Sequence, residues 1–147
     1  MNSCTFFGHH SITKEITSTL LSTLIDLIEN HDVKLFYVGN HGAFDSIVQK
    51  TLFELSEKYA ISFYVVLAYV PGKKSEPYCQ IEYETILPEG IENVPRRFAI
   101  IYRNKWMINR SDYVVTYVSN EIGSGAARFK RLAEQKHKSI IELCSDI

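Results

Sequence analysis

Three short segments of the chain carry the glycines and polar residues that bind anionic ligands in many proteins. They cover residues 7–10, 39–45 and 119–127, and each follows an apolar run. Glycine lets a backbone approach a ligand closely, and the first turn of a following helix offers free N–H groups to a phosphate. Each glycine could instead serve only a tight turn, but two such turns after two strands favour ligand binding.

The polar side chains of the first two segments suit a ribose or a phosphate. His9, His10 and His41 can form hydrogen bonds or exchange protons near neutral pH, although solvated turn histidines are the simpler alternative. Asp45 either accepts ribose hydroxyls or provides a favourable charge in the first turn of a helix. No set of His, Cys and carboxylate residues at ligand spacing accompanies them, so we predict no metal site.

Cations are concentrated further along the chain, between residues 96 and 110. A solvated helix face is the common explanation for such a run. Arg96 and Arg97 nevertheless directly follow Pro95 and a long loop, where guanidinium groups could clamp a phosphate from across a cleft. Asn104 lies on the same element and is predicted to support a base.

These considerations define the candidate ligand-binding and catalytic residues. The predicted ligand-binding residues are Gly8, His9, His10, Gly39, Asn40, Gly42, Asp45, Arg96, Arg97, Asn104, Gly123, Ser124, Gly125 and Ala126. If the protein cleaves a glycosidic bond, a carboxylate must act as general acid or base. The leading candidates for that role are Glu84 and Glu121, with Glu82 and Glu89 as further alternatives.

The elements that must position these residues alternate between strands and helices. Short apolar runs rich in β-branched and aromatic residues predict strands, and apolar residues three and four positions apart predict helices. The predicted strands cover residues 4–7, 34–38, 61–70, 112–118 and 139–143. The predicted helices cover residues 12–28, 43–59, 96–110 and 126–136, and residues 73–95 are predicted to form a long surface loop.

This order predicts a single α/β domain over residues 1–147. Strands separated by helices imply right-handed crossovers and a parallel sheet, and runs that are apolar at every position fit strands covered on both faces. We therefore expect a three-layer, Rossmann-like open sheet of about five parallel strands with helices on both faces. Ligands of such sheets bind beyond the carboxyl ends of the strands, where the three segments are expected to lie.

The amino-acid composition reduces the number of possible functions. Hydrophobic residues make up 46% of the 147 residues, charged residues 22%, and the formal net charge is −1. Because a basic excess is missing, bulk binding of DNA or RNA is not expected. Three scattered cysteines without a CxxC pair suit a reducing compartment. No apolar stretch reaches the length of a membrane span, so we expect no membrane partner. We further expect a cytoplasmic protein without a cofactor.

Taken in order, the motifs resemble the SLOG superfamily of Rossmann-like nucleotide-binding proteins, which includes the Lonely Guy phosphoribohydrolases and the DNA-processing protein A fold. The small single-domain bacterial branch related to YpsA and YoqJ is the most similar, and the likeness covers nearly the whole chain. It rests on Cys4-Thr5-Phe6-Phe7-Gly8-His9-His10, Gly39-Asn40-His41-Gly42-Ala43-Phe44-Asp45, Pro95-Arg96-Arg97 with Arg103-Asn104-Lys105-Trp106-Met107, and Gly123-Ser124-Gly125-Ala126-Ala127.

The resemblance implies that a nucleotide, a nucleoside sugar or an ADP-ribose-like molecule lies over these turns. Lonely Guy enzymes carry a catalytic carboxylate in the helix after the last glycine turn, whereas this chain has Arg128 and Phe129 there. Binding or sensing of a nucleotide or nucleotide-derived ligand is therefore the leading expectation. N-glycosidic hydrolysis or transfer on nucleotides is the enzymatic alternative, and a fold-only interaction module is the third. The helical face of residues 96–110 is of a kind that pairs in dimers, so a homo-oligomer is an alternative to a monomer.

Overall fold

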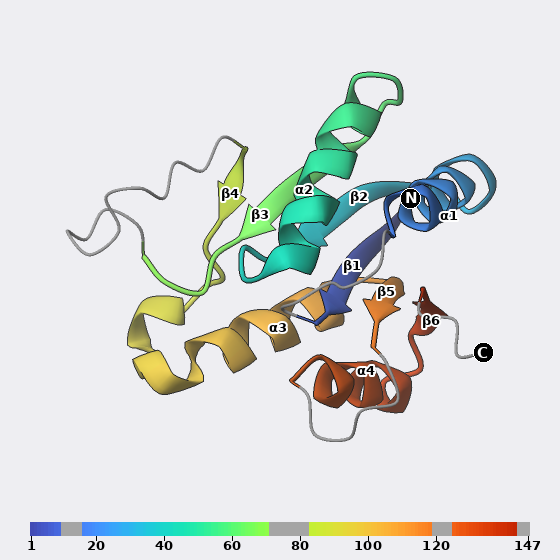
Figure 1. Cartoon of the computed structure of the whole chain (residues 1–147). Helices are drawn as coiled ribbons and strands as arrows, with labels where there is room; N and C mark the ends of the chain where they lie inside the picture. Colours follow the sequence, from blue (N-terminus) through green and yellow to red (C-terminus); the bar gives the residue numbers. More distant parts are fainter. Residues whose placement is uncertain (10–15, 71–82, 119–124, 144–147) are drawn as a thin grey trace.

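A computed structural model describes residues 1–9, 16–70, 83–118 and 125–143 of the chain. Its centre is a six-stranded, all-parallel sheet with the strand order β4-β3-β2-β1-β5-β6 (Figure 1). The predicted parallel α/β fold is confirmed, with one strand more than expected. The strands are β1 (Asn2–Gly8), β2 (Val33–Val38), β3 (Ser62–Val66), β4 (Thr85–Ile86), β5 (Tyr113–Tyr117) and β6 (Ser139–Glu142).

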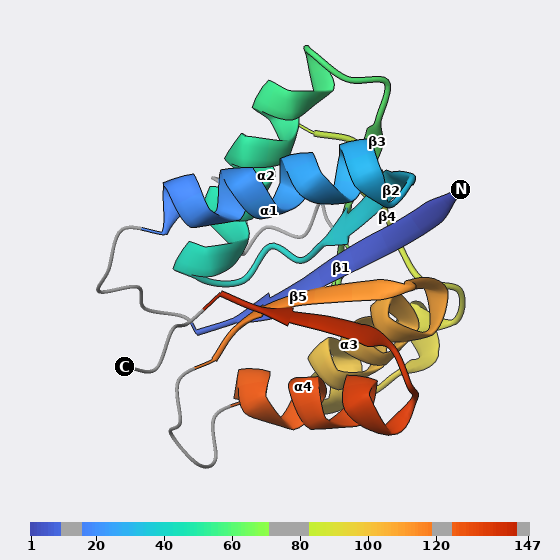
Figure 2. The same ribbon diagram turned by 90° about the vertical axis from the view of Figure 1, so that its right-hand side faces the viewer.

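Helices cover both faces of the sheet, which makes three layers (Figure 2). The helices α1 (Thr17–Asn30) and α2 (Ala43–Ser56) lie on one face. On the opposite face lie α3 (Ala99–Arg110) and α4 (Gly125–Gln135). Two 3-10 turns, η1 (Ile91–Asn93) and η2 (Arg96–Phe98), precede α3.

The hydrophobic core is divided between the two faces of the sheet. Successive side chains of a strand point to opposite faces, so Phe6 and Phe36 pack beneath α1 and α2, with their ring centroids 6.1 Å apart. Their neighbours Phe7 and Tyr37 pack beneath α3 and α4. Strands buried on both faces need apolar residues at nearly every position, which is why the strands appear in the sequence as continuous apolar runs.

The direction in which the chain progresses reverses between β1 and β5. From β1 the chain passes through α1 to β2 and then through α2 to β3, moving toward one edge of the sheet. From β5 it passes through α4 to β6 at the opposite edge. The helices that follow these two adjacent strands therefore diverge to opposite faces and leave a crevice at the carboxyl ends, where such folds bind ligands.

The structure corrects the prediction of about five strands and of a long irregular loop. The described end of that loop, residues 83–95, contains β4 and η1. Thr85 and Ile86 pair with Val65 and Val66, so β4 extends the sheet at its edge. A strand of two residues is too short to show an alternating or continuous apolar pattern, and long-range pairing therefore decided its formation.

Two predicted boundaries also differ from the structure. The predicted strand over residues 61–70 ends at Val66, although Leu67 and Ala68 remain buried. The apolar run here thus indicated burial rather than the extent of strand pairing. The predicted helix over residues 96–110 starts as a separate 3-10 turn, in which the Phe98 N–H donates to the Pro95 carbonyl at 2.8 Å, and α3 begins only at Ala99.

Candidate functional site

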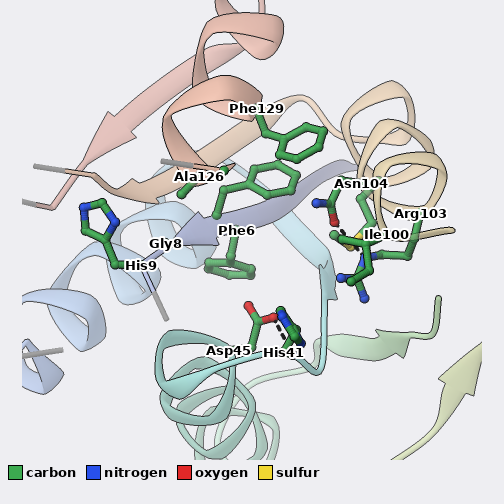
Figure 3. Close-up of a pocket in the computed structure, with 13 residues that line it drawn as sticks. Phe6, Gly8, His9, His41, Asp45, Ile100, Arg103, Asn104, Ala126 and Phe129 are labelled. Carbon is green, nitrogen blue, oxygen red and sulfur yellow. Dashed lines mark hydrogen bonds between the residues drawn. The ribbon is translucent and has the colours of Figure 1, made fainter. Parts of the chain in front are cut away.

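A cleft of about 140 Å³ opens at the carboxyl ends of the central strands (Figure 3). The turn after β2 borders it on one face of the sheet, and α3 and α4 border it on the other. The cleft therefore lies at the reversal point of the sheet, where ligands bind in folds of this type. Its lining residues are Phe6, Phe7, Gly8, His9, His41, Asp45, Ile100, Arg103, Asn104, Met107, Gly125, Ala126 and Phe129.

Arg103 is a buried cation in the wall of this cleft, only 3% exposed. Its Nη1 donates to the Val66 carbonyl at 2.8 Å, and its Nε donates to Asn104 Oδ1 at 2.7 Å. Among the described residues, no hydrogen bond engages Nη2. Burial lowers the pKa of the guanidinium, and the charge of Asp45 opposes that effect. Because arginine stays protonated in proteins, the cleft holds a permanent positive charge.

The turn after β2 brings a carboxylate toward this cation. Asp45 Oδ2 accepts a hydrogen bond from the His41 backbone N–H at 2.9 Å. A Cβ atom at position 39 would lie 2.8 Å from Asp45 Oδ2 and 3.0 Å from Arg103 Nη1, so a side chain there would displace at least one of the two charged groups. Gly39 therefore allows both groups to approach the same backbone. Gln49 Nε2 holds the same turn by donating to the Gly39 carbonyl at 2.7 Å.

Two helices begin at the cleft. Gly42 is the N-cap of α2 and has a φ of 97°, a conformation that favours glycine. Gly125 begins α4, and a Cβ added there would meet no described atom within 4 Å. The first turn of a helix presents N–H groups and a positive dipole end. Both helix starts and Arg103 therefore favour an anion, while Asp45 partly offsets the charge on the α2 side.

Aromatic rings stack in pairs at the cleft and next to it. Phe7 and Phe129 line the cleft and stack with centroids 5.5 Å apart, whereas Phe44 stacks on Tyr117 at 6.1 Å without lining it. A Cβ at Gly8 would lie 2.4 Å from the Phe44 ring. This glycine is therefore explained by close packing of Phe44 against the end of β1, whatever the ligand.

Glu142 joins the strands and the helix behind the cleft. Its Oε1 accepts hydrogen bonds from Thr116 Oγ1 at 2.6 Å and from Lys130 Nζ at 2.9 Å, and its Oε2 accepts one from the Val118 N–H at 2.9 Å. The carboxylate thus connects the end of β5, the middle of α4 and the end of β6. Glu142 does not line the cleft, so we assign it a structural role in holding α4 against the sheet.

The structure brings many of the predicted ligand-binding residues together. Gly39, Asn40 and Gly42 belong to the turn that carries Asp45, but they do not line the cleft. His9 lines it while its backbone N–H donates to the Tyr117 carbonyl at 3.3 Å. The predicted residues that share the cleft are Gly8, His9, Asp45, Asn104, Gly125 and Ala126. His10, Glu82, Glu121, Gly123 and Ser124 lie outside the described residues.

The two arginines predicted to clamp a phosphate lie elsewhere on the surface. Arg96 and Arg97 are exposed and do not line the cleft. The Arg96 Cζ lies 4.3 Å from the centroid of the Tyr69 ring, and the Arg97 Cζ lies 4.8 Å from that of Phe98.

Neither described glutamate candidate for catalysis lines the cleft. Glu84 lines a separate hollow near the start of β3. Glu89 is exposed, and its carbonyl accepts the Tyr102 hydroxyl.

Sequence reasoning missed Arg103, which was counted among the solvated cations of its helix. The signal that could have found it is helical spacing. Ile100, Arg103, Asn104 and Met107 are separated by three, one and three positions, so they share one face of a helix. A charged residue on an otherwise apolar, inward face is buried and must find partners there.

No protein-family model matches the chain, and no curated protein is significantly similar to it in sequence. None of the described helices combines the length and apolar character that crossing a bilayer requires. Within the described ranges, no three His, Cys, Asp or Glu side chains gather as metal ligands would. What the cleft binds must therefore be inferred from its own geometry.

Proposed function

We propose that the chain binds or senses a nucleotide or a nucleotide-derived ligand, such as an ADP-ribose-like molecule or a nucleoside phosphate, in this cleft. The observation that carries the proposal is the buried guanidinium of Arg103 at the reversal point of the sheet. Burying a charge is costly unless it is paired and hydrogen-bonded. Val66 and Asn104 satisfy two of the guanidinium nitrogens. No buried side-chain nitrogen of the described residues lacks a partner, so Nη2 is reached by solvent, which an anionic oxygen in the cleft would replace.

The arrangement of charges suggests how the ligand is oriented. A phosphate is attracted to Arg103 and to the start of α4, where Gly125 leaves the backbone accessible. A phosphate beside Asp45 would be repelled, whereas ribose hydroxyls can donate to that carboxylate. Ligand sites commonly measure about 300–1,000 Å³, so a cleft of about 140 Å³ accommodates part of a nucleotide. We assign the ribose and one phosphate to it.

Thermal unfolding of the full chain with a panel of ligands tests the proposal. The panel contains AMP, ADP, ADP-ribose, NAD, GTP, adenosine and inorganic phosphate. A ligand that binds only the native state raises stability by about 2.7 kcal/mol at a hundred times its Kd. We expect a saturable rise in Tm with one nucleotide class and a smaller one with adenosine, which lacks the phosphate. The absence of any shift across the panel would overturn the proposal.

A paired substitution locates the binding. Arg103→Met removes the buried charge at similar volume, and Arg97→Met removes an exposed one of the same type. The shift must disappear in the first variant and persist in the second. A shift that persists in Arg103→Met but disappears in Arg97→Met would instead assign the anion to the outer surface near η2.

The enzymatic alternative depends on a carboxylate at the cleft. Of the described residues that line it, Asp45 alone carries one. N-glycosidic cleavage would require it as general acid or base, and chromatography of nucleotide incubations would then reveal a free base. Release that continues unchanged in Asp45→Asn would exclude that residue from the reaction.

A further inference from the structure

A second hollow of about 290 Å³ lies at the other end of α2, away from the cleft. The last turn of α2 contributes Phe53 and Ser56, and the start of β3 contributes Ser62 and Phe63. Residues 83 and 84 complete its wall. They lead into β4, which lies at the edge of the sheet (Figure 1). The backbone here is fixed because the Val65 N–H donates to the Glu84 carbonyl at 2.9 Å. The hollow is therefore part of the folded sheet edge.

Four aromatic residues line this hollow, and three of them form a contacting cluster. Tyr83 contacts Phe53 with centroids 5.5 Å apart and planes tilted by 40°, and it contacts Phe63 at 5.4 Å and 58°. Phe53 remains 45% exposed although it lies on an ordered helix. Aromatic faces carry a negative electrostatic potential, and several of them around one hollow bind ammonium groups by cation–π attraction.

The polar groups at the hollow also favour a cation. Glu84 is exposed and supplies the one carboxylate among the described residues that line it, and none of these residues is cationic. The carboxyl-terminal end of a helix carries a partial negative charge, and the last turn of α2 has no basic residue to compensate it. Lys58 follows the helix but does not line the hollow. Aromatic faces, a carboxylate and a helix end thus favour the same sign of charge.

We propose that this hollow binds an alkylated ammonium group, of the kind found in choline or in a methylated lysine. Alkyl groups on the nitrogen lower its cost of leaving water and contact Phe53, Phe63 and Tyr83, while the positive charge is attracted to Glu84. A neutral group of equal size would retain the apolar contacts and lose the electrostatic part. The site is separate from the nucleotide cleft and does not depend on it.

NMR titration of the full chain tests the proposal with two matched probes. Choline carries a quaternary ammonium group, and 3,3-dimethyl-1-butanol is its neutral isostere. We expect choline to shift the signals of Phe53, Tyr83 and Glu84 saturably and to bind about fivefold more tightly than the isostere. Glu84→Gln and Phe53→Ala should each weaken choline binding by about fivefold. The exposed Glu54→Gln, on the same helix but outside the hollow, should leave binding unchanged.

A peptide containing trimethyllysine distinguishes the two sources of the group. Tighter binding of this peptide than of choline, lost when the lysine is unmodified, assigns the hollow to a partner protein. Tighter binding of choline assigns it to a free metabolite. Equal binding of the neutral isostere, no saturable shift with either ammonium probe, or full affinity in both hollow variants would overturn the proposal. Because the cleft residues are untouched, failure here leaves the nucleotide proposal standing.

Discussion

The two ends of α2 present opposite chemistry to the solvent. At its start lies the cleft, with a buried guanidinium, two helix N-termini and one glycine, Gly125, that leaves the backbone accessible. At its end lies the hollow, with a cluster of aromatic rings and an exposed carboxylate. The helix dipole favours an anion at the first and a cation at the second.

The charges at the two ends of α2 differ in how strongly they act on a ligand, because one is buried and the other is exposed. Arg103 is 3% exposed, so water and salt screen its charge little, whereas the exposed Glu84 is screened. Charge substitutions in the cleft should therefore have larger effects than those in the hollow.

Arg103→Met should reduce nucleotide affinity by about ten- to a hundredfold, because a charge-assisted hydrogen bond in a buried site contributes about 1.5–3 kcal/mol. Titration calorimetry of wild type and variant measures the ratio. Choline binding in the hollow should stay the same. If the affinities for the nucleotide and for choline fell together, the variant would disturb the whole fold, and the cleft and the hollow would be coupled.

Gly8→Ala should destabilise the protein by about 1–3 kcal/mol, because the added methyl group overlaps the Phe44 ring. Urea unfolding followed by circular dichroism measures this loss. A free energy of unfolding equal to that of the wild type would show that Phe44 moves aside readily and that its packing against the end of β1 is loose.

Gly125→Ala should separate ligand binding from stability. Its methyl group enters open space, so the free energy of unfolding should stay equal or rise by up to about 1 kcal/mol through the better helix propensity of alanine. Nucleotide affinity should fall by about threefold to tenfold if the ligand approaches this backbone and loses a hydrogen bond. Unchanged affinity would move the anion away from the start of α4.

Lys130→Met should have the smallest effect. It removes the ion pair with Glu142, in which the Lys130 side chain is 25% exposed and that of Glu142 is 22% exposed, and it keeps the hydrogen bonds that Glu142 accepts from Thr116 and Val118. A partly exposed pair contributes at most about 1 kcal/mol. Urea unfolding should show that small loss at low salt and less of it at high salt, and the hollow should bind choline as before. A salt-independent loss of several times this size would show that the pair acts as a buried one.

Much of the fold could be predicted because the strands and helices of a parallel α/β protein each show a recognisable pattern of apolar residues along the chain. Runs such as residues 34–38 and 112–118 are apolar at most strand positions, Lys34 and Thr116 being the exceptions within the strands, and the helices show apolar residues at spacings of three and four. That residues 39–45 and 119–127 collect at one edge was predicted from the order of elements, since parallel strands end at the same edge. His41 and Asp45 of the first segment share a cleft with Gly125 and Ala126 of the second, whereas residues 119–124 lie outside the described residues. Nucleotide binding there stays a prediction.

The alternation of strands and helices, the covered sheet and the edge at which polar turns collect can be derived from the amino-acid order, because each depends on patterns within a few residues. Tertiary packing instead selects which cation faces the cleft. Arg96 and Arg97 lie in a 3-10 turn, outside the helical phase that turns Arg103 inward. It also decided that β4 forms and that Glu84 joins the aromatic hollow, because both depend on pairing with β3 across the sheet edge.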